Sequence, residues 1–208
     1  MDNNQDIFGF IFMLRQSAIC QNCLPKFKKI DRNHCPQCYR QQKNKDICND
    51  CLEWNKTDKP LKNQSIFKYD ANFSSFMHRY KYMGDYRLRH EFNHLAKQEL
   101  KHIKQRFDIV ATIPLTSEGL VKRKFNQVEG IFGTQDQILK INKGIQMSGL
   151  SHAQRRKQVI DFEVMALVQD KKILLLDDVY TSGTTLHQAS SALYQNGALQ
   201  VQSLTLAR

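Results

Sequence analysis

Apolar residues recur with helical spacing in several segments between residues 65 and 208. In the segment 72–83, Phe73, Phe76, Met77 and Tyr80 occupy the i, i+3, i+4 and i+7 positions, which is the spacing of an amphipathic helix. A second helix is expected to follow, with Asp85 as its N-cap. Helices are predicted at residues 72–83, 85–103, 126–141 and 185–197.

Short apolar runs with strand character lie between and around these helices. Strands are predicted at residues 65–70, 108–114, 171–178 and 201–207. In the third of them the apolar residues 173–176 are continuous rather than alternating, as in a central strand that is covered on both faces. Because strands alternate with helices, the sequence predicts an α/β fold with a parallel sheet and helices on both faces.

Residues 1–64 have a different character, being polar and cysteine-bearing with little periodic hydrophobicity. They end in the lysine-rich stretch NKTDKPLKNQ, which is typical of a linker. We therefore expect two units, a cysteine-rich module with its linker over residues 1–64 and the α/β domain over residues 65–208.

All six cysteines belong to three C-x-x-C pairs, CQNC, CPQC and CNDC, within the first 51 residues. A segment with so few apolar residues cannot build a core, and binding of a structural Zn²⁺ would supply its folding energy, at about 10 to 16 kcal/mol. Zinc takes four ligands. The preferred set is Cys35, Cys38, Cys48 and Cys51, and the alternative set is Cys20, Cys23, Cys35 and Cys38.

The chain carries a formal net charge of +11, which favours polyanionic partners such as nucleic acid or phosphorylated metabolites. The longest apolar run near its start, residues 7–14, is far shorter than the roughly 20 residues of a membrane span. We expect no transmembrane segment and a reducing, cytoplasmic location in which the cysteines bind metal rather than form disulfides.

The third predicted strand runs directly into Asp177 and Asp178 and then into the hydroxyl-rich loop TSGTT, residues 181–185. Ligands of open α/β sheets bind at the carboxyl ends of strands, and the N-terminus of a following helix suits a phosphate. The two carboxylates would repel that phosphate, so they require a part of the ligand that donates hydrogen bonds. A ribose 5-phosphate meets both demands, with its phosphate in the loop and its hydroxyls on the carboxylates.

Residues 173–185 resemble the phosphoribosyl-pyrophosphate (PRPP) motif of type I phosphoribosyltransferases. Three further stretches resemble the ComF (ComFC/GntX) family, whose members join such a domain to an N-terminal zinc module: YKYMGD at 80–85, IPLTSEGLVKRKFNQ at 113–127 and GLSHAQRRKQV at 149–159. One departure is Lys124, which stands where that family has glycine, so a glycine-dependent turn is in question.

The resemblance implies a type I phosphoribosyltransferase-like sheet with a small N-terminal zinc ribbon, and a PRPP site that uses Mg²⁺. Asp177 and Asp178 would be the catalytic pair. The PRPP-binding residues would be Asp177, Asp178, Thr181, Ser182, Gly183, Thr184, Thr185, Lys122, Arg123, Arg155 and Arg156, the two last from a flap. Lys122, Arg123 and Lys124 would contact nucleic acid, although basic residues of this kind also form ordinary solvated faces.

Two functions follow as expectations. By resemblance, the first is a competence protein that helps to bring transforming single-stranded DNA into the cytosol, beside a helicase-like ATPase and peripheral to the membrane at the uptake machinery. The second is an active PRPP-dependent phosphoribosyltransferase in nucleotide salvage or nucleic-acid modification. The intact loop favours PRPP binding in both cases.

Overall fold

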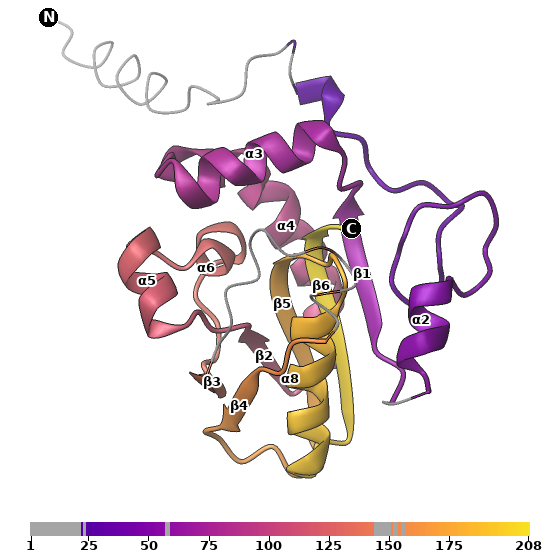
Figure 1. Ribbon diagram of the computed structural model, residues 1–208, viewed down its shortest axis with the longest axis vertical. Coiled ribbons are helices and arrows are strands. Elements are labelled where there is room, and N and C mark those ends of the chain that lie inside the picture. Colours follow the sequence, from indigo (N-terminus) through magenta and orange to yellow (C-terminus); the bar gives the residue numbers. More distant parts are fainter. Residues whose placement is uncertain (1–21, 23, 57–58, 144–150, 152–153, 155–156) are drawn as a thin grey trace, which may run out of the picture.

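The fold is built on a four-stranded sheet in a computed structural model that describes residues 22, 24–56, 59–143, 151, 154 and 157–208. The strand order is β1 (Lys62–Phe67), β6 (Gln200–Ala207), β5 (Lys172–Val179) and β2 (Ile109–Thr112), and all neighbours are parallel. Figure 1 shows the strands with their carboxyl ends upward, below helix α3 (Ala71–Tyr82). The predicted parallel sheet is confirmed.

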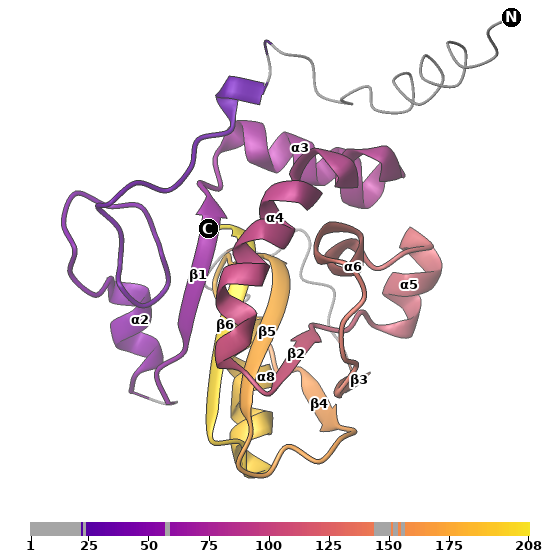
Figure 2. The ribbon, with the colours of Figure 1, turned by 180° about the vertical axis from the view of Figure 1, so that it is seen from behind.

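Helices cover both faces of this sheet. One face carries α3, α4 (Arg89–Ile103) and α6 (Gln127–Phe132), whose apolar residues share one core. The other face carries α8 (Thr184–Gln195), which belongs to a second core. Figure 1 shows α8 in front of the sheet, and the reverse view in Figure 2 shows α4 in front of it. The expected arrangement of helices on both faces is confirmed.

The central strand β5 explains why both layers form. Leu174 and Leu176 contribute to the core under α4, while Ile173 and Leu175 contribute to the core under α8. All four side chains are 1% exposed or less. Successive side chains of a strand point to opposite faces, so a continuous apolar run is buried only where both faces are covered.

Several shorter elements complete the described part of the chain. The remaining helices and strands are η1 (Leu24–Lys26), α2 (Asn49–Trp54), η2 (Tyr86–Leu88), η3 (Lys104–Arg106), α5 (Ser117–Arg123), β3 (Leu139–Lys143) and β4 (Asp161–Val164). Strands β3 and β4 pair antiparallel in a sheet of their own.

The predicted helix over residues 126–141 is wrong in its second half. Helix α6 ends at Phe132, and Gly133 has a φ of 87°, a conformation that ends a helix and favours glycine. Residues 139–143 form β3 instead. The charged segment before α6, for which no helix is predicted, forms the short helix α5, where the Thr116 side chain accepts a hydrogen bond from the Gly119 amide.

Two boundaries also differ from the predicted ones. The first strand runs over residues 62–67 rather than 65–70, so the expected division between residues 64 and 65 falls within β1. Asp85 precedes η2, and its carboxylate pairs with Arg79 at 2.9 Å instead of capping an amide. Helix α4 then begins at Arg89.

The cysteine-rich segment is attached to the sheet through a polar network on β1. The Asn63 side chain donates to Ser65 Oγ at 2.8 Å and accepts from Ser203 Oγ at 2.9 Å. The Asn63 backbone amide donates to the Gln37 backbone carbonyl at 2.8 Å. All three polar side chains on the sheet are buried. Because buried polar groups are costly when unpaired, this network fixes one way of docking the segment.

Helix α5 ends at Lys124 in the left-handed conformation, with φ of 63° and ψ of 3°. The Lys124 amide donates to the Leu120 carbonyl at 2.7 Å, which completes a C-terminal cap of the kind that usually contains glycine. The backbone therefore makes the glycine-type turn although the residue is lysine. An L-residue in this conformation costs about 1 to 2 kcal/mol.

Lys124→Gly should raise the free energy of unfolding by up to about 1 kcal/mol, because the relieved strain exceeds the extra backbone entropy of glycine. Urea denaturation followed by circular dichroism measures the change. Lys124→Ala removes the same charge but keeps the Cβ atom, so it should not stabilise the protein. Equal stabilisation by both substitutions would attribute the gain to charge and contradict this explanation.

Candidate functional site

Asp177 and Asp178 lie at the carboxyl end of β5, where the strand leaves the two cores. Asp178 is buried at 3% exposure, and its backbone amide donates to Asp177 Oδ1 at 2.8 Å. Asp177 is half-buried. The apolar run ahead of them is fixed inside the sheet, so the carboxylates are held rigidly at its edge, which is where ligands of open α/β sheets bind.

Lys81 neutralises the inner carboxylate. Its Nζ lies 2.9 Å from both carboxylate oxygens of Asp178 and comes from the last turn of α3. The lysine side chain is 18% exposed and the aspartate side chain 5% exposed. Breaking a buried pair of this kind leaves an uncompensated charge, so Lys81 ties α3 to the carboxyl end of the sheet.

Burial and the adjacent Asp178 raise the pKa of Asp177 to about 7, although Lys81 opposes the shift. The two carboxylates at the sheet edge therefore differ in their electrostatic environment. Asp178 is paired with a cation, whereas Asp177 titrates near neutral pH, where a hydrogen-bond donor or a cation from a ligand would favour its ionised form.

The TSGTT loop turns sharply from β5 into α8. Gly183 has a φ of 80°, and a Cβ atom there would lie 2.4 Å from Tyr180 Oη, so only glycine fits. Ser182 Oγ and Thr184 Oγ1 are 2.9 Å apart. Helix α8 has no acidic residue in its first turn. Its N-terminus offers backbone amides and the positive dipole end that suit a phosphate.

A cavity of about 620 Å³ joins the carboxylates, the loop and the basic helix α5. This volume is in the range of small-molecule sites. The expected site residues that line it are Lys122, Arg123, Asp177, Asp178, Thr181, Ser182, Gly183, Thr184 and Thr185. Lys124 is exposed at the end of α5 and lies outside this lining. Arg155 and Arg156 fall outside the residues that the structure describes.

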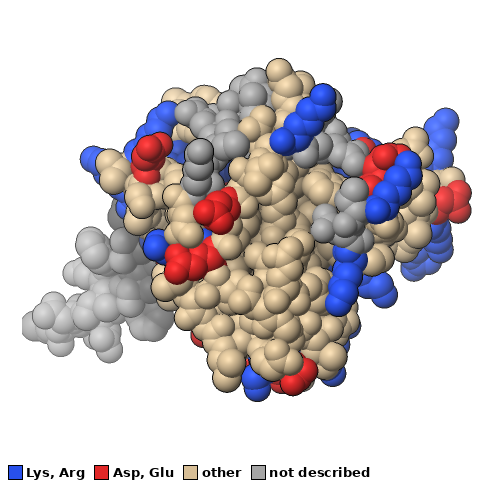
Figure 3. Space-filling view, turned by 60° about the horizontal axis from the view of Figure 1, so that its bottom comes forward, with Lys and Arg blue, Asp and Glu red and all other residues tan. Residues whose placement is uncertain are grey.

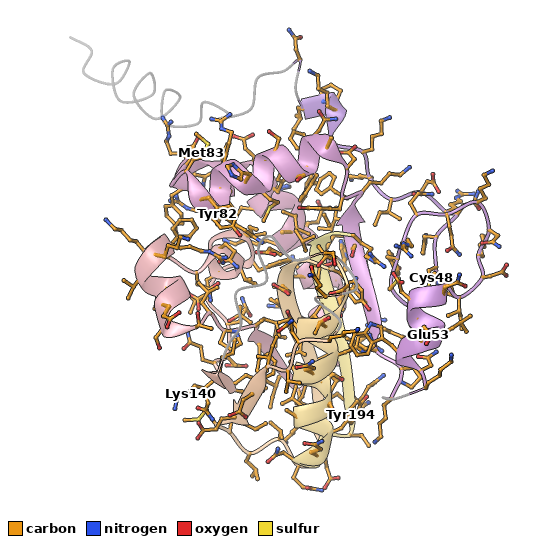
Figure 4. The ribbon with its side chains drawn as sticks, in the orientation of Figure 1. Cys48, Glu53, Tyr82, Met83, Lys140 and Tyr194 are labelled. Carbon is orange, nitrogen blue, oxygen red and sulfur yellow. The ribbon has the colours of Figure 1, made fainter. Side chains whose placement is uncertain are left out.

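Arg123 is held over the cavity by two neighbours. Its Nη1 donates to Gln127 Oε1 at 2.9 Å, and its guanidinium lies 5.5 Å from the centre of the Tyr82 ring. Figure 4 shows Tyr82 at the end of α3 that approaches α5. A guanidinium fixed in this way is suited to bind phosphate oxygens with two parallel hydrogen bonds.

The four preferred cysteines form a compact cluster beside β1. Their sulfur atoms all lie within 4.8 Å of one another, with Cys35 and Cys51 3.8 Å apart and Cys38 and Cys48 3.6 Å apart. A tetrahedral Zn²⁺ with bonds of about 2.3 Å places its sulfurs roughly 3.8 Å apart, whereas a disulfide requires about 2.05 Å. The donor set therefore fits a metal ion of the zinc type.

The crowding of the four thiols points the same way. Four thiolates whose sulfur atoms lie within 4.8 Å of one another would repel each other. Ionising all four sulfurs requires a cation among them. Cys20 and Cys23, which belong to the alternative set, lie outside the described residues.

Three residues of this region were missed by the sequence reasoning. Lys81 lies within the YKYMGD stretch, which signals it only through the family resemblance. Trp54 and Arg208 gave no signal that links them to the site. Trp54 Nε1 donates to the Ser182 carbonyl at 2.9 Å, and Arg208 Nη1 donates to the Thr181 carbonyl at 2.8 Å.

The parallel sheet, the carboxylate pair at its edge and the hydroxyl loop before α8 define a phosphoribosyltransferase-type domain. The family model described as "Phosphoribosyl transferase domain" matches residues 87–208. The chain is 31% identical to Competence protein ComFC of Streptococcus pneumoniae (strain ATCC BAA-255 / R6), over 97% of this chain and 93% of that protein. It is 28% identical to Competence protein ComFC of Bacillus subtilis (strain 168), over 99% of this chain and 91% of that protein.

A third relative, DNA utilization protein YhgH of Escherichia coli O157:H7, is 24% identical over 92% of this chain and 90% of its own length. The chain belongs to the ComF/ComFC family, with a phosphoribosyltransferase domain. None of the helices in the described part of the chain has the length and apolar character needed to span a bilayer.

Asp177→Asn should make the protein more stable at neutral pH. Since the folded-state pKa of about 7 exceeds the unfolded value of about 3.9, Asp177 lowers stability progressively as the pH rises from about 4 to about 7. Asparagine removes this dependence, so the advantage of the variant should grow over that range. Urea titrations at about pH 5 and pH 7 measure it, with the exposed Asp161→Asn as control. A constant difference at both pH values would contradict the prediction.

Proposed function

We propose that the cavity binds PRPP or a related phosphoribosyl compound. The observation that carries the proposal is one cavity whose lining includes the Asp177–Asp178 pair, a hydroxyl loop at a helix N-terminus, and the cations Lys122 and Arg123. These groups suit the sugar hydroxyls, the 5-phosphate and the pyrophosphate of such a ligand. Each charge-assisted hydrogen bond contributes about 1.5 to 3 kcal/mol, more than the roughly 0.3 to 1 kcal/mol from the helix dipole.

The carboxylates and the loop would hold the ligand by its two ends. Asp177 and Asp178 would accept hydrogen bonds from the ribose hydroxyls, and Lys81 would hold the Asp178 carboxylate in place through their 2.9 Å contact. Lys122 and Arg123 would face the pyrophosphate, and the carboxylates are the kind of oxygen ligand that suits a Mg²⁺ carried with it. By resemblance, Arg155 or Arg156 would be added from the segment before β4.

We further propose that the protein works in the handling of transforming single-stranded DNA in the cytoplasm, with a helicase-like ATPase as partner. The full-length similarity to proteins named for competence and DNA utilization supports this role. The positive charge is unevenly spread. Figure 3 shows one face whose Lys and Arg side chains lie toward the edges of a broad uncharged middle. The cations proposed to contact the single-stranded DNA lie at the end of α5 and are Lys122, Arg123 and Lys124.

A second candidate is glycosyl transfer from PRPP. It is favoured by Lys122 and Arg123 in the same cavity, because displacement of pyrophosphate depends mainly on neutralising the charge that develops on it. Mg²⁺ would supply further neutralisation when bound. Release of pyrophosphate from PRPP in the presence of nucleobases, with and without single-stranded DNA, distinguishes turnover from binding alone.

The double variant Asp177→Asn, Asp178→Asn should bind PRPP at least about 10-fold more weakly in calorimetry, because two charged acceptors for the ribose hydroxyls are lost. Its affinity for inorganic phosphate should be unchanged, since that ligand occupies only the loop. Gly183→Ala should weaken both ligands because its Cβ meets Tyr180. Unchanged PRPP affinity in the double variant would overturn the ribose assignment.

Single-stranded DNA affinity should fall steeply with salt, since the proposed contacts are to phosphates. Each lost contact reduces the slope of log affinity against log salt by about 0.7. Lys122→Gln, Arg123→Gln and Lys124→Gln should each do so in fluorescence anisotropy. Lys101→Gln, an exposed lysine on α4, is the matched control. If the affinity is independent of salt, or if Lys101→Gln reduces the slope as much as the three α5 variants do, the end of α5 is not the DNA-binding surface.

A further inference from the structure

The cysteine cluster and the TSGTT loop (residues 181–185), called the phosphate loop below, are far apart in the sequence but meet through helix α2. Cys48 is the N-cap of α2 and Cys51 lies within it. A helix of six residues has little stability of its own, so the two cysteines and the metal that fits them hold it in place. The same helix carries Trp54, which contacts the loop, and Asp50, which pairs with the loop-contacting Arg208. Figure 4 labels Cys48 and Glu53 on this helix.

Trp54 makes the first connection. Its ring is buried and stacks on the His187 ring of α8, with centroids 4.2 Å apart and planes at 8°. Its Nε1 donates to the Ser182 carbonyl oxygen at 2.9 Å. His187 Nε2 is in turn 3.0 Å from Tyr180 Oη, the atom that lies against Gly183. The indole therefore contacts the turn directly at Ser182, and it is linked to Tyr180 through His187.

Arg208 makes the second connection. Its Nη1 donates to the Thr181 carbonyl oxygen at 2.8 Å, and its Nη2 lies 3.4 Å from Asp50 Oδ2. Asp50 is also paired with Arg40 at 2.9 Å. The Arg208 side chain is only 7% exposed, and its guanidinium lies 4.8 Å from the centre of the Tyr180 ring. The C-terminal residue thus joins α2 to the loop.

These two contacts determine the direction of the loop amides. In a planar trans peptide the N–H and the C=O point in opposite directions. The Thr181 carbonyl shares its peptide with the Ser182 amide, and the Ser182 carbonyl shares its peptide with the Gly183 amide. Because both carbonyls are held toward α2 and Arg208, both amides are directed away from them, and the residues that carry these amides line the cavity.

We propose that the metal-binding cysteine cluster sets the geometry of the phosphate loop through Trp54 and the Asp50–Arg208 pair, so that metal occupancy controls the affinity for the phosphate group of the ligand. The identity of that ligand rests on the proposed function. The coupling itself rests only on the carbonyl contacts. Trp54 and Arg208 are positioning residues, since they act on the ligand through the backbone of the loop.

Trp54→Phe tests the first connection without touching the cysteines, because phenylalanine keeps an aromatic ring on His187 but lacks the N–H donor. The variant should retain the zinc content of the wild type. It should show faster hydrogen exchange at residues 181–186 and bind PRPP about 2- to 12-fold more weakly, the worth of one hydrogen bond. Arg208→Ala should act in the same direction through the Thr181 carbonyl.

Leu52→Ala is the matched control, since Leu52 belongs to the same helix and is 48% exposed. If Trp54→Phe and Arg208→Ala match Leu52→Ala in loop exchange and in PRPP affinity, the coupling is overturned. If the wild type binds no PRPP, the proposed ligand is wrong, and the exchange of residues 181–186 still decides the coupling.

Metal removal provides the second measurement, with Trp54 as its reporter because it is the sole tryptophan of the chain. Titration with a chelator should shift the emission of Trp54 and accelerate exchange at residues 181–186 at the same chelator concentration. Helix α4, in the other core, should stay protected, which separates the local effect from global unfolding. Loss of zinc with unchanged loop exchange would contradict the proposal.

Discussion

The burial of β5 on both faces is the constraint on which the site depends. Residues 173–176 satisfy two cores at once, and this leaves no freedom to shift the strand along its axis, since a slip of one residue would exchange the two sets of side chains. The next two residues are therefore delivered to the sheet edge, and the chain must turn there. The positions of Asp177, Asp178 and the TSGTT loop follow from the burial of four apolar side chains.

The buried negative charge at this edge of the sheet is compensated by a cation. A buried carboxylate without a partner would be costly, and Lys81 provides the partner for Asp178 from a helix on the far side of the cavity. Burial and the adjacent Asp178 raise the pKa of Asp177 to about 7. The cations of α5 remain available to a ligand. The arrangement combines acceptors, donors and cations in one cavity, which is what a phosphorylated sugar requires of its site.

The cysteine-rich segment contacts the loop that lines this site. It is docked on β1 by a buried polar network around Asn63. Trp54 contacts the TSGTT loop directly, and Asp50 pairs with Arg208, which contacts the same loop. A small segment without a core of its own can take such a position only if something else fixes its internal geometry. The cluster of four sulfurs can do this when it binds a metal.

The sequence by itself determined the parallel sheet, the place of its central strand, the sheet edge that carries the acidic pair and the cysteines that gather, because hydrophobic period, the position of acids after a buried run and C-x-x-C spacing are local properties. It misplaced the elements between residues 126 and 143, where a short helix and a strand have similar apolar content, and it predicted no helix where α5 forms. Lys81, Trp54 and Arg208 were decided only by the tertiary structure. Their partners lie 97, 128 and 27 residues away. Trp54 and Arg208 also donate to backbone carbonyls, and such a bond requires no particular residue type at the accepting position. Contacts of that kind leave no pattern in a single sequence, because they depend on where the folded layers bring the chain back to itself.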